Sequence, residues 1–376
     1  MRFIPYGKQW VTTEDIDSVA EVLESDFLTT GPKVKEFEEA VAAYCGAKFA
    51  VAVCNGTAAL HLASIVLLNS GDKVLTTPNS FLATSNAVLY AGATPVFVDI
   101  QENGNIDLDL CEEALKSDLS IKALYAVHFS GNPVEQEKLA RLKKRYGITI
   151  LEDCAHSIGA EYKGIKAGSC THSEASIFSF HPVKHMTTGE GGMITTNDET
   201  IYERLKVLRN HGMVKTPDMK PWEYEMRELG FNYRITDLQC ALGISQLKKL
   251  DSFIQRRKEL AKTYDEAFMD TSLVRPLYNY NGYSSYHLYV ALADFSRLNI
   301  SKEQLFIKMR ERGIGLQLHY IPINRQPYYR GLGYGEEITP VMDRYYAECF
   351  SLPLYPKMRD EEQQYVIETL LELLNG

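Results

Sequence analysis

Between residues 49 and 151, short apolar runs rich in β-prone residues alternate with longer segments whose apolar residues recur every three or four positions. This alternation predicts βαβ units, and therefore a mostly parallel sheet with helices on both faces. Ligands of such sheets bind beyond the carboxyl ends of the strands. The predicted strands are 49–53, 73–77, 94–99, 121–127 and 148–151, and the helices that follow the first four end near residues 68, 90, 115 and 146.

The chain has 376 residues, which is more than one compact domain usually holds. We expect a large domain over residues 1–250 and a smaller α+β domain over 251–376. A long amphipathic helix at 237–268 would connect them, and residues 211–229 would form a loop-rich insertion. The other expected elements are helices at 14–24, 34–44, 199–209, 302–312 and from 360, and strands at 288–292 and 315–320.

Charge and cysteine usage narrow the class of protein. The 49 acidic residues outnumber the 40 basic ones, and the densest basic runs also carry acids, so we expect no nucleic-acid partner. No apolar run is long enough to cross a membrane and the first residues do not resemble a signal peptide, which predicts a cytoplasmic protein. The seven scattered cysteines predict reduced core residues and no metal site.

One lysine stands apart from the others in the sequence. Lys184 lies in a turn between two apolar, β-prone runs at 175–180 and 193–196. A Schiff base is the main reason to bury an amine at a strand end, because it needs the neutral amine and a lowered pKa. Lys184 therefore implies an aldehyde cofactor. The alternative is an ordinary exposed lysine in a hairpin.

A candidate anion site follows the first predicted strand. The small residues of 54–59 lead from that strand into a helix, whose first amide groups have no partner within it. No dinucleotide-binding or P-loop motif is present. The Ser179 hydroxyl and the glycines of 189–192 would suit a phosphate-bearing cofactor. Plain helix capping would explain 54–59 equally well.

A second informative stretch is Ile148 to His156, which ends in Glu-Asp-Cys-Ala-His. It predicts that Asp153 lies just past a buried strand, where its carboxylate could pair with a protonated ring nitrogen, as in pyridoxal phosphate enzymes. Phe81, which heads a helix beside another strand end, could stack on an aromatic ligand. The alternatives are a helix cap for Asp153, a hydrogen-bonded core histidine for His156 and a packed core aromatic for Phe81.

These stretches, in this order, resemble the sugar aminotransferases of the DegT/StrS family, which are pyridoxal phosphate enzymes of fold type I. The resemblance implies a large domain with a mostly parallel seven-stranded sheet and a smaller α+β domain. The stretches that carry it are 28–32, 55–62, 94–99, 152–156, 178–184, 189–192, 232–234 and 241–243.

The family resemblance implies a role for each candidate residue in the chemistry. It implies that Lys184 binds pyridoxal 5'-phosphate (PLP) covalently as a Schiff base. Asp153 would pair with the pyridine nitrogen, and His156 would lie against the ring. Lys184 would then act as the base, and Asp153 would be the partner of the pyridine ring that serves as the electron sink.

The remaining cofactor contacts are also implied by the resemblance. Thr57, Ala58 and Ser179 would hold the phosphate, and Phe81 would stack on the ring. Asn232 would reach the phosphate from a partner subunit. This last assignment implies a homodimer with shared active sites.

Within the family, the chain is most similar to the transaminases of pseudaminic acid biosynthesis. That similarity rests on 180–184, 243–251 and 319–320, and it departs at 55–57 and at His185, where proline is expected. It implies transfer of the amino group of L-glutamate to the C4 ketone of a UDP-linked 4-keto-6-deoxy-N-acetylhexosamine of L-configuration. Hydroxyls and imidazoles suit sugar nucleotides, and our candidate substrate contacts are Tyr6, Thr29, His181, His319 and Tyr320.

Three alternatives stay open at this point. The chain could act on another nucleotide keto sugar, D-configured or a 3-keto isomer. It could also be a non-catalytic PLP-binding regulator, or a colourless α/β sugar-binding protein. Retention of both Lys184 and Asp153 favours an enzyme, and the family's dehydratases have histidine in place of that lysine.

Overall fold

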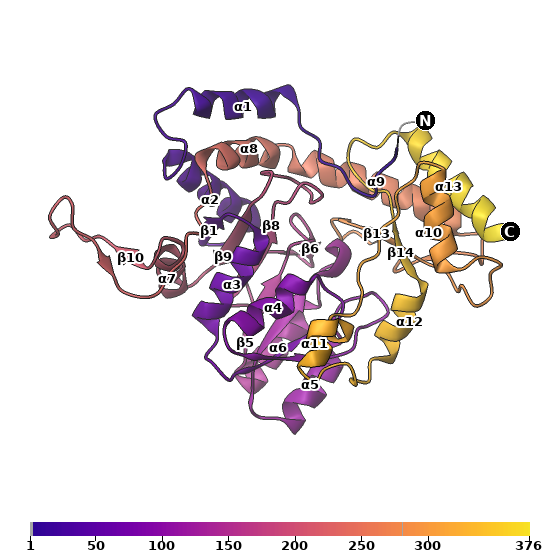
Figure 1. The fold of residues 1–376 in the computed structure, drawn as a ribbon, viewed down its shortest axis with the longest axis horizontal. Helices are drawn as coiled ribbons and strands as arrows, with labels where there is room; N and C mark the ends of the chain where they lie inside the picture. Colours follow the sequence, from indigo (N-terminus) through magenta and orange to yellow (C-terminus); the bar gives the residue numbers. More distant parts are fainter. Residues whose placement is uncertain (1–2, 280) are drawn as a thin grey trace.

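A central seven-stranded sheet organises the protein, in a computed structural model that describes residues 3–279 and 281–376 (Figure 1). The strand order is β1-β9-β8-β5-β4-β2-β3, and β9 runs opposite to the other six strands. The strands are β1 (Phe49–Val53), β2 (Lys73–Thr76), β3 (Thr94–Phe97), β4 (Ile121–Val127), β5 (Thr149–Asp153), β8 (Ala175–Ser179) and β9 (Gly192–Thr196). The expected mostly parallel sheet is confirmed.

Helices cover both faces of the sheet, because its strands are apolar on both sides. Val51 and Val53 of β1 pack with α3, α4 and α7 on one face, while Ala50 and Ala52 pack with α2 and α8 on the other. Helices α5 and α6 cover β2, β4 and β5 on that second face. These helices are α2 (Pro32–Cys45), α3 (Gly56–Leu67), α4 (Leu82–Tyr90), α5 (Leu108–Ser117), α6 (Gln136–Tyr146), α7 (Glu199–Arg209) and α8 (Asp237–Leu247).

The long helix expected over 237–268 is wrong, because the chain forms two helices there. Helix α8 ends at Leu247, and α9 (Leu250–Phe268) begins after Lys249. Lys249 donates to Asp15, a fully buried residue of α1 (Thr13–Leu23), at 2.6 Å, and Gln246 donates to the same carboxylate at 2.7 Å. The break therefore lies where the chain pairs with α1, a contact that helical periodicity does not report.

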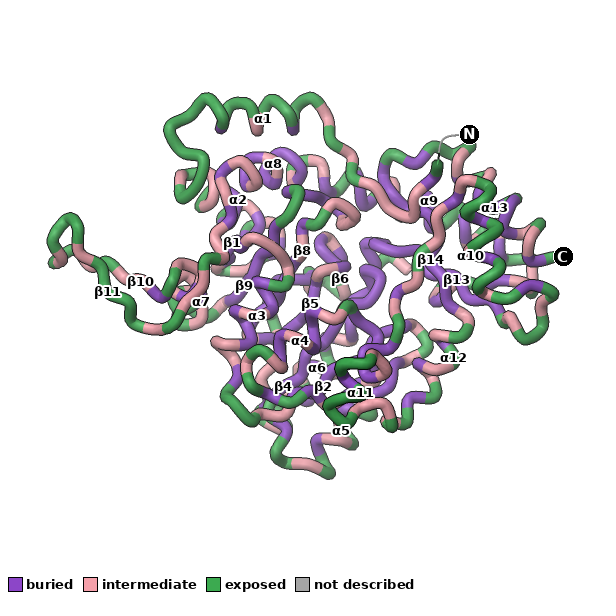
Figure 2. Tube along the Cα trace, viewed as in Figure 1, coloured by how far each residue is buried: buried purple, intermediate pink, exposed green. Residues whose placement is uncertain are grey.

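The insertion expected at 211–229 forms an arm that projects from the body of the protein (Figures 1 and 2). Its two short strands, β10 (Met213–Val214) and β11 (Glu225–Met226), pair antiparallel. The arm carries exposed apolar side chains at Trp222, Tyr224, Met226 and Leu229. Exposed apolar side chains gathered on one segment mark a candidate interaction site.

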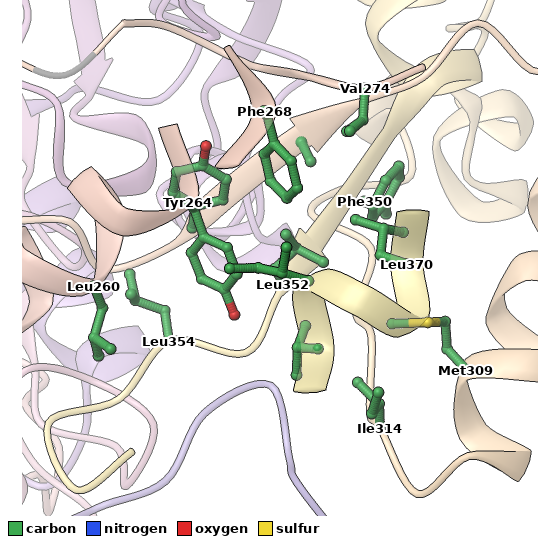
Figure 3. Packing of buried hydrophobic residues seen from close by; sticks show 14 of the residues in the cluster. Leu260, Tyr264, Phe268, Val274, Met309, Ile314, Phe350, Leu352, Leu354 and Leu370 are labelled. Carbon is green, nitrogen blue, oxygen red and sulfur yellow. The ribbon is translucent and has the colours of Figure 1, made fainter. Parts of the chain in front are cut away.

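The C-terminal part forms a second core around an antiparallel sheet (Figure 3). Tyr264 and Phe268 of α9 pack there with Phe350 and Leu352, and Ile4 joins them from the N-terminal segment. The elements of this part are β12 (Arg275–Pro276), β13 (Tyr289–Leu292), α10 (Lys302–Glu311), η2 (Ile323–Arg325), α11 (Pro327–Gly331), α12 (Pro340–Glu348), β14 (Cys349–Leu352) and α13 (Asp360–Asn375).

The strand expected at 315–320 is also wrong. That segment is extended but makes single bridges only, Gln317 to Ser351 and, just before it, Ile314 to Ile4. It lies against the rim of the small sheet and does not pair along its length. The remaining elements are η1 (Phe129–Gly131), β6 (Glu161–Tyr162) and β7 (Ile165–Lys166).

All seven cysteines are unpaired, and all except the partly exposed Cys54 are buried. Within the described ranges 3–279 and 281–376, there is no cluster of three or more side chains suited to hold a metal ion. In the same ranges, every helix is too short or too polar to cross a membrane.

Candidate active site

A cavity of about 660 Å³ opens at the carboxyl ends of the parallel strands. Val127 at the end of β4, Asp153 at the end of β5 and Ser179 at the end of β8 all line it. Its position agrees with the rule for sheets of this kind. The sequence-predicted residues that line it are Tyr6, Thr57, Phe81, Asp153, His156, Ser179, His181, Lys184, His319 and Tyr320.

Lys184 lies in the turn that follows β8, with its side chain facing the cavity. The turn is closed by the Lys184 N–H, which donates to the His181 carbonyl at 2.9 Å. Burial lowers the pKa of Lys184 to about 8, although the Asp153 carboxylate opposes this shift. A substantial fraction of the amine is therefore neutral near pH 8 and can attack an aldehyde.

Asp153 is the last residue of β5 and is buried. One of its oxygens accepts from the Thr84 hydroxyl at 2.7 Å, and the other accepts from the Ala155 N–H at 3.1 Å. Burial raises the pKa of Asp153, and the hydrogen bond from Thr84 and the charge of Lys184 oppose the rise. A cationic ring nitrogen beside this carboxylate would compensate the cost of burying its charge.

His156 lies one turn beyond Asp153 and is also buried. Its Nε2 forms a hydrogen bond with the Tyr320 hydroxyl at 3.1 Å, and the two rings stack with centroids 6.1 Å apart. Burial and the charge of Lys184 lower the pKa of His156 well below its ordinary value. His156 is therefore a neutral ring, held by a residue 164 positions along the chain.

The start of α3, where an anion site was predicted, is a capped helix N-terminus. Asn55 caps the helix, and its side-chain oxygen accepts from the Ala58 N–H at 2.8 Å. Capping thus takes up the Ala58 amide, and the buried Ala58 side chain lies outside the residues that line the cavity. Gly56 and Thr57, together with Ser179 from β8, do face the cavity.

Phe81 is 58% exposed and stands at the rim of the cavity. Its ring centroid lies 6.2 Å from that of Tyr320. This exposure decides against the packed core aromatic and leaves a ring face open to a ligand.

The candidate substrate contacts divide into two groups. Tyr6, His181, His319 and Tyr320 line the cavity. His319 is buried, forms a hydrogen bond with Ser351 Oγ at 2.8 Å, and has its pKa lowered by burial to about 3. Thr29 is exposed and does not line the cavity of its own subunit.

Asn232 also lies away from its own cavity and is exposed. Its neighbours Phe231 and Tyr233 both pack against His61 of α3, with ring centroids 4.9 and 5.9 Å away. Because alternate residues of an extended segment point to opposite sides, these two contacts leave Asn232 directed away from the body.

Several cavity residues were missed by the sequence reasoning. Thr84 could have been found from its spacing, because it is one helical turn after Phe81 on α4. Asn55 stood within the motif but was not assigned a role. Glu190, His287 and Gln317 also line the cavity, and only the tertiary structure brings the last two there.

The residues present fit PLP. The His156 Nδ1 atom is buried without a hydrogen-bond partner in the described residues. A Cβ added at Gly56 would lie only 2.9 Å from Ser179 Cβ, so the backbone approaches the serine closely enough to form a cradle. Thr57 and Ser179 would hold the phosphate at the helix start, Asp153 would face the ring nitrogen, and Lys184 would supply the amine.

Gly56→Ala is expected to weaken PLP binding by about tenfold or more, because overpacking of this kind costs about 1–3 kcal/mol. The dissociation constant can be measured by titrating the apoprotein and following visible absorbance. Gly331→Ala is the matched control, since a Cβ there meets nothing within 4 Å. Equal affinities for both variants would contradict a phosphate cradle at Gly56.

Comparison with known proteins places this site in a family. Residues 10–371 match the DegT/DnrJ/EryC1/StrS aminotransferase family. A UDP-4-amino-4,6-dideoxy-N-acetyl-beta-L-altrosamine transaminase from Campylobacter jejuni is 41% identical, covering 99% of this chain and 97% of its own. The spore coat polysaccharide biosynthesis protein SpsC of Bacillus subtilis is 39% identical, covering 100% of this chain and 98% of its own.

A solved structure agrees with these sequence relatives. Helicobacter pylori PseC, an aminotransferase involved in the biosynthesis of pseudoaminic acid, superposes with a TM-score of 0.93 at 34% identity, covering 99% of each chain. The match therefore extends over the sheet, the cavity and the C-terminal part together. The chain belongs to the DegT/DnrJ/EryC1/StrS aminotransferase family.

Proposed function

We propose that the protein transfers the amino group of L-glutamate to the C4 ketone of a UDP-linked 4-keto-6-deoxy-N-acetylhexosamine of L-configuration, a step of pseudaminic acid biosynthesis. The observation that carries the chemistry is one cavity lined by an amine with a lowered pKa, Lys184, and a buried carboxylate, Asp153. The sugar is proposed from the names of the Campylobacter relative and of PseC.

Enzymes of this family use PLP, which supplies an aldehyde that captures amines and a ring that takes up an electron pair. We assign its covalent attachment to Lys184. Once the amine of glutamate has displaced Lys184 from the aldehyde, the freed, neutral Lys184 amine would accept the proton from the α-carbon of glutamate, and it would later donate a proton to C4 of the sugar. Because one amine serves both carbons from one side, the orientation of the bound sugar sets the new stereocentre.

The other cavity residues orient the reactants. Asp153 would favour a positive charge at the ring nitrogen of bound PLP, and the Thr84 hydroxyl donates to its carboxylate. Tyr320 holds the His156 ring. We assign the sugar nucleotide contacts to Tyr6, His181, His319 and Tyr320, with Thr29 supplied by a partner subunit.

We propose that the active enzyme is a homodimer whose sites are shared. The support is the position of Asn232 and Thr29, which are exposed outside their own cavity. The nearby arm with Trp222 and Tyr224 also presents apolar surface that a partner would cover. Closed twofold pairing places the same surface on both subunits and so completes two sites at once.

Mixing Lys184→Ala with Asn232→Ala is expected to restore about a quarter of the wild-type activity, measured at limiting PLP. After subunit exchange, half of the dimers are mixed, and each mixed dimer holds one site with both native residues. Each variant alone is the control, and both should be poorly active under these conditions. Absence of any recovery after exchange, verified by native mass spectrometry, would place Asn232 outside the shared site.

The proposed reaction can be followed by visible absorbance of the purified protein. Glutamate should bleach the yellow band, and the UDP-linked keto sugar of L-configuration should restore it. Because SpsC is almost as similar as the Campylobacter enzyme, a D-configured 4-keto sugar and a 3-keto isomer belong in the same experiment. Recovery with one of these alone would identify a different acceptor, and a band that glutamate leaves unchanged would contradict the transaminase.

We propose two further properties of the protein. The first is the division into domains at residue 250, the first residue of α9. The second is the cytoplasmic location of an enzyme that acts on small molecules, without a nucleic-acid or membrane partner.

A further inference from the structure

A short segment, 284–288, connects the C-terminal part to η1 of the large domain. Its Ser285 N–H donates to the Gly131 carbonyl at 3.0 Å, and its Leu288 N–H donates to the Ser130 carbonyl at 3.2 Å. A Cβ added at Gly131 would lie 2.8 Å from the Tyr286 nitrogen, so the two backbones are in close contact. The segment is therefore pressed against the large domain, with His287 facing the cavity.

His185 connects this segment to the lysine turn. It follows Lys184 directly, is buried, and its Nε2 donates to the Ser285 carbonyl at 3.0 Å. The carbonyl can only accept, which places the ring proton on Nε2. Proline, the residue expected here by resemblance, has no side-chain donor. His185 therefore makes a contact that proline could not make at this position.

The three histidines form a row of rings from the lysine turn to the cavity wall. The His185 and His287 centroids are 5.5 Å apart, and those of His287 and His156 are 4.4 Å apart. Burial and nearby cations, including Lys184, lower the pKa of all three, so the rings pack as neutral groups. In the described residues, each of the three rings has a buried Nδ1 without a partner. Ring packing therefore holds the row, together with the Nε2 contacts of His185 and His156.

Arg257 of α9 also contacts this segment. It is fully buried, and its Nη1 donates to the His287 carbonyl at 3.1 Å and to the Leu354 carbonyl at 2.8 Å. The segment therefore accepts hydrogen bonds from two buried side chains, the guanidinium in the C-terminal part and the imidazole of His185 in the lysine turn.

We propose that His185 is a positioning residue, which ties the Lys184 turn to segment 284–288 and, through the His287 ring, sets Lys184 relative to His156. The proposal rests on the assignment of Lys184 as the reacting amine. Without the His185 bond, the turn would be free to move away from the cavity wall. Water would then reach the amine, and the desolvation that holds its pKa down would diminish.

Two substitutions at position 185 distinguish a positioning role, which needs the hydrogen bond, from a role in which the side chain only fills space. His185→Gln keeps an N–H donor near the place of Nε2, whereas His185→Leu keeps the bulk and removes the donor. In the apoprotein, the pKa of Lys184 can be measured by competitive acetylation followed by mass spectrometry of its peptide. The groups that face Lys184 across the cavity stay unchanged in both variants: Tyr6, Asp153, His156, His181, Glu190, His287, His319 and Tyr320.

We expect His185→Leu to raise the pKa of Lys184 by about one unit and to weaken PLP binding about tenfold. His185→Gln should leave both near the wild-type values. If the leucine variant does not fold, His185→Phe serves the same purpose, because it keeps a ring without the donor. Equal values of both quantities for the leucine, glutamine and wild-type proteins would overturn the proposal.

Val366→Ala controls for a general loss of stability. Val366 is buried in the C-terminal core and does not line the cavity. The Val366→Ala substitution should lower the unfolding temperature while leaving the pKa of Lys184 unchanged. The apoprotein measurement involves no sugar, so a wrongly assigned sugar acceptor would not affect this result. If Lys184 does not bind PLP, both the positioning role of His185 and the proposed function are contradicted.

Discussion

Lys184→Ala is expected to reduce kcat for transamination by about 10⁴-fold or more, because it removes both the covalent attachment and the base. The purified variant should also lack the visible band that covalent attachment produces. Half-reactions with glutamate, followed by single-turnover absorbance, measure the loss directly. The fold should be retained, since the side chain faces a cavity and not the core.

Lys302→Ala is the matched control, because Lys302 is also a partly buried lysine. Burial also lowers the pKa of Lys302, but its amine donates to the Tyr346 carbonyl, away from the cavity. This variant should keep full activity. In the wild-type apoprotein, the rate of PLP capture should rise with pH and level off above about 8, the pKa of Lys184. A capture rate that does not change with pH between 7 and 9 would contradict the assignment of the amine.

Asp153→Asn is expected to reduce kcat by about 10²- to 10⁴-fold, because the amide cannot hold a positive charge on the ring nitrogen. The loss should appear in kcat for both half-reactions, because each needs the ring as an electron sink. Steady-state kinetics with saturating PLP measures it. Activity within a few fold of wild type would remove Asp153 from the chemistry.

The same substitution should not destabilise the apoprotein at neutral pH. Burial raises the folded-state pKa of Asp153 above its unfolded value, so the stability that this group contributes is present below the unfolded pKa and is lost as pH rises through the folded pKa. Asparagine does not ionise. The unfolding free energy of the variant relative to wild type should therefore increase from about pH 4 upward, measured by urea denaturation.

Asp99→Asn provides the contrast among buried carboxylates. Asp99 accepts from the backbone N–H groups of Ile100, Val341 and Met342 at 2.8 to 2.9 Å and does not line the cavity. Its replacement should lower stability and leave PLP affinity unchanged. The two variants should therefore differ: Asp153→Asn should lose activity and keep its stability, whereas Asp99→Asn should lose stability and keep its affinity for PLP. This contrast would distinguish a carboxylate that serves the cofactor from one that serves the fold.

The α/β part was predictable because its signal is local. Each strand from β1 to β5 is an apolar run, and each intervening helix has its own periodicity, so neighbouring residues carry the information. The break between α8 and α9 carries no local signal, and the residue that Lys249 pairs with there, Asp15 of α1, lies more than 200 residues away. The strand predicted at 315–320 was wrong because strand formation also depends on distant residues. The alternation of this segment is strand-like, but it has no partner strand along its length.

In the candidate site, too, the residues with a local signal were predictable and those placed by distant contacts were not. Lys184, Asp153 and Gly56 could be chosen from sequence because each follows or ends a strand, and parallel strands end at one edge of the sheet. Their roles came from the family resemblance. His287 and Gln317 carry no local signal, and the approach of the C-terminal part alone places them at the cavity.

The sequence by itself determined the α/β class, the family and the residues at the strand ends, because hydrophobic period and motif spacing are written in neighbouring positions. Only the tertiary structure decided which distant residues meet those strand ends: Tyr320 on His156, His185 on the carbonyl of Ser285, and Thr84 on Asp153. The physical reason is that such contacts depend on how the second core docks on the sheet, and docking is set by packing over the whole chain.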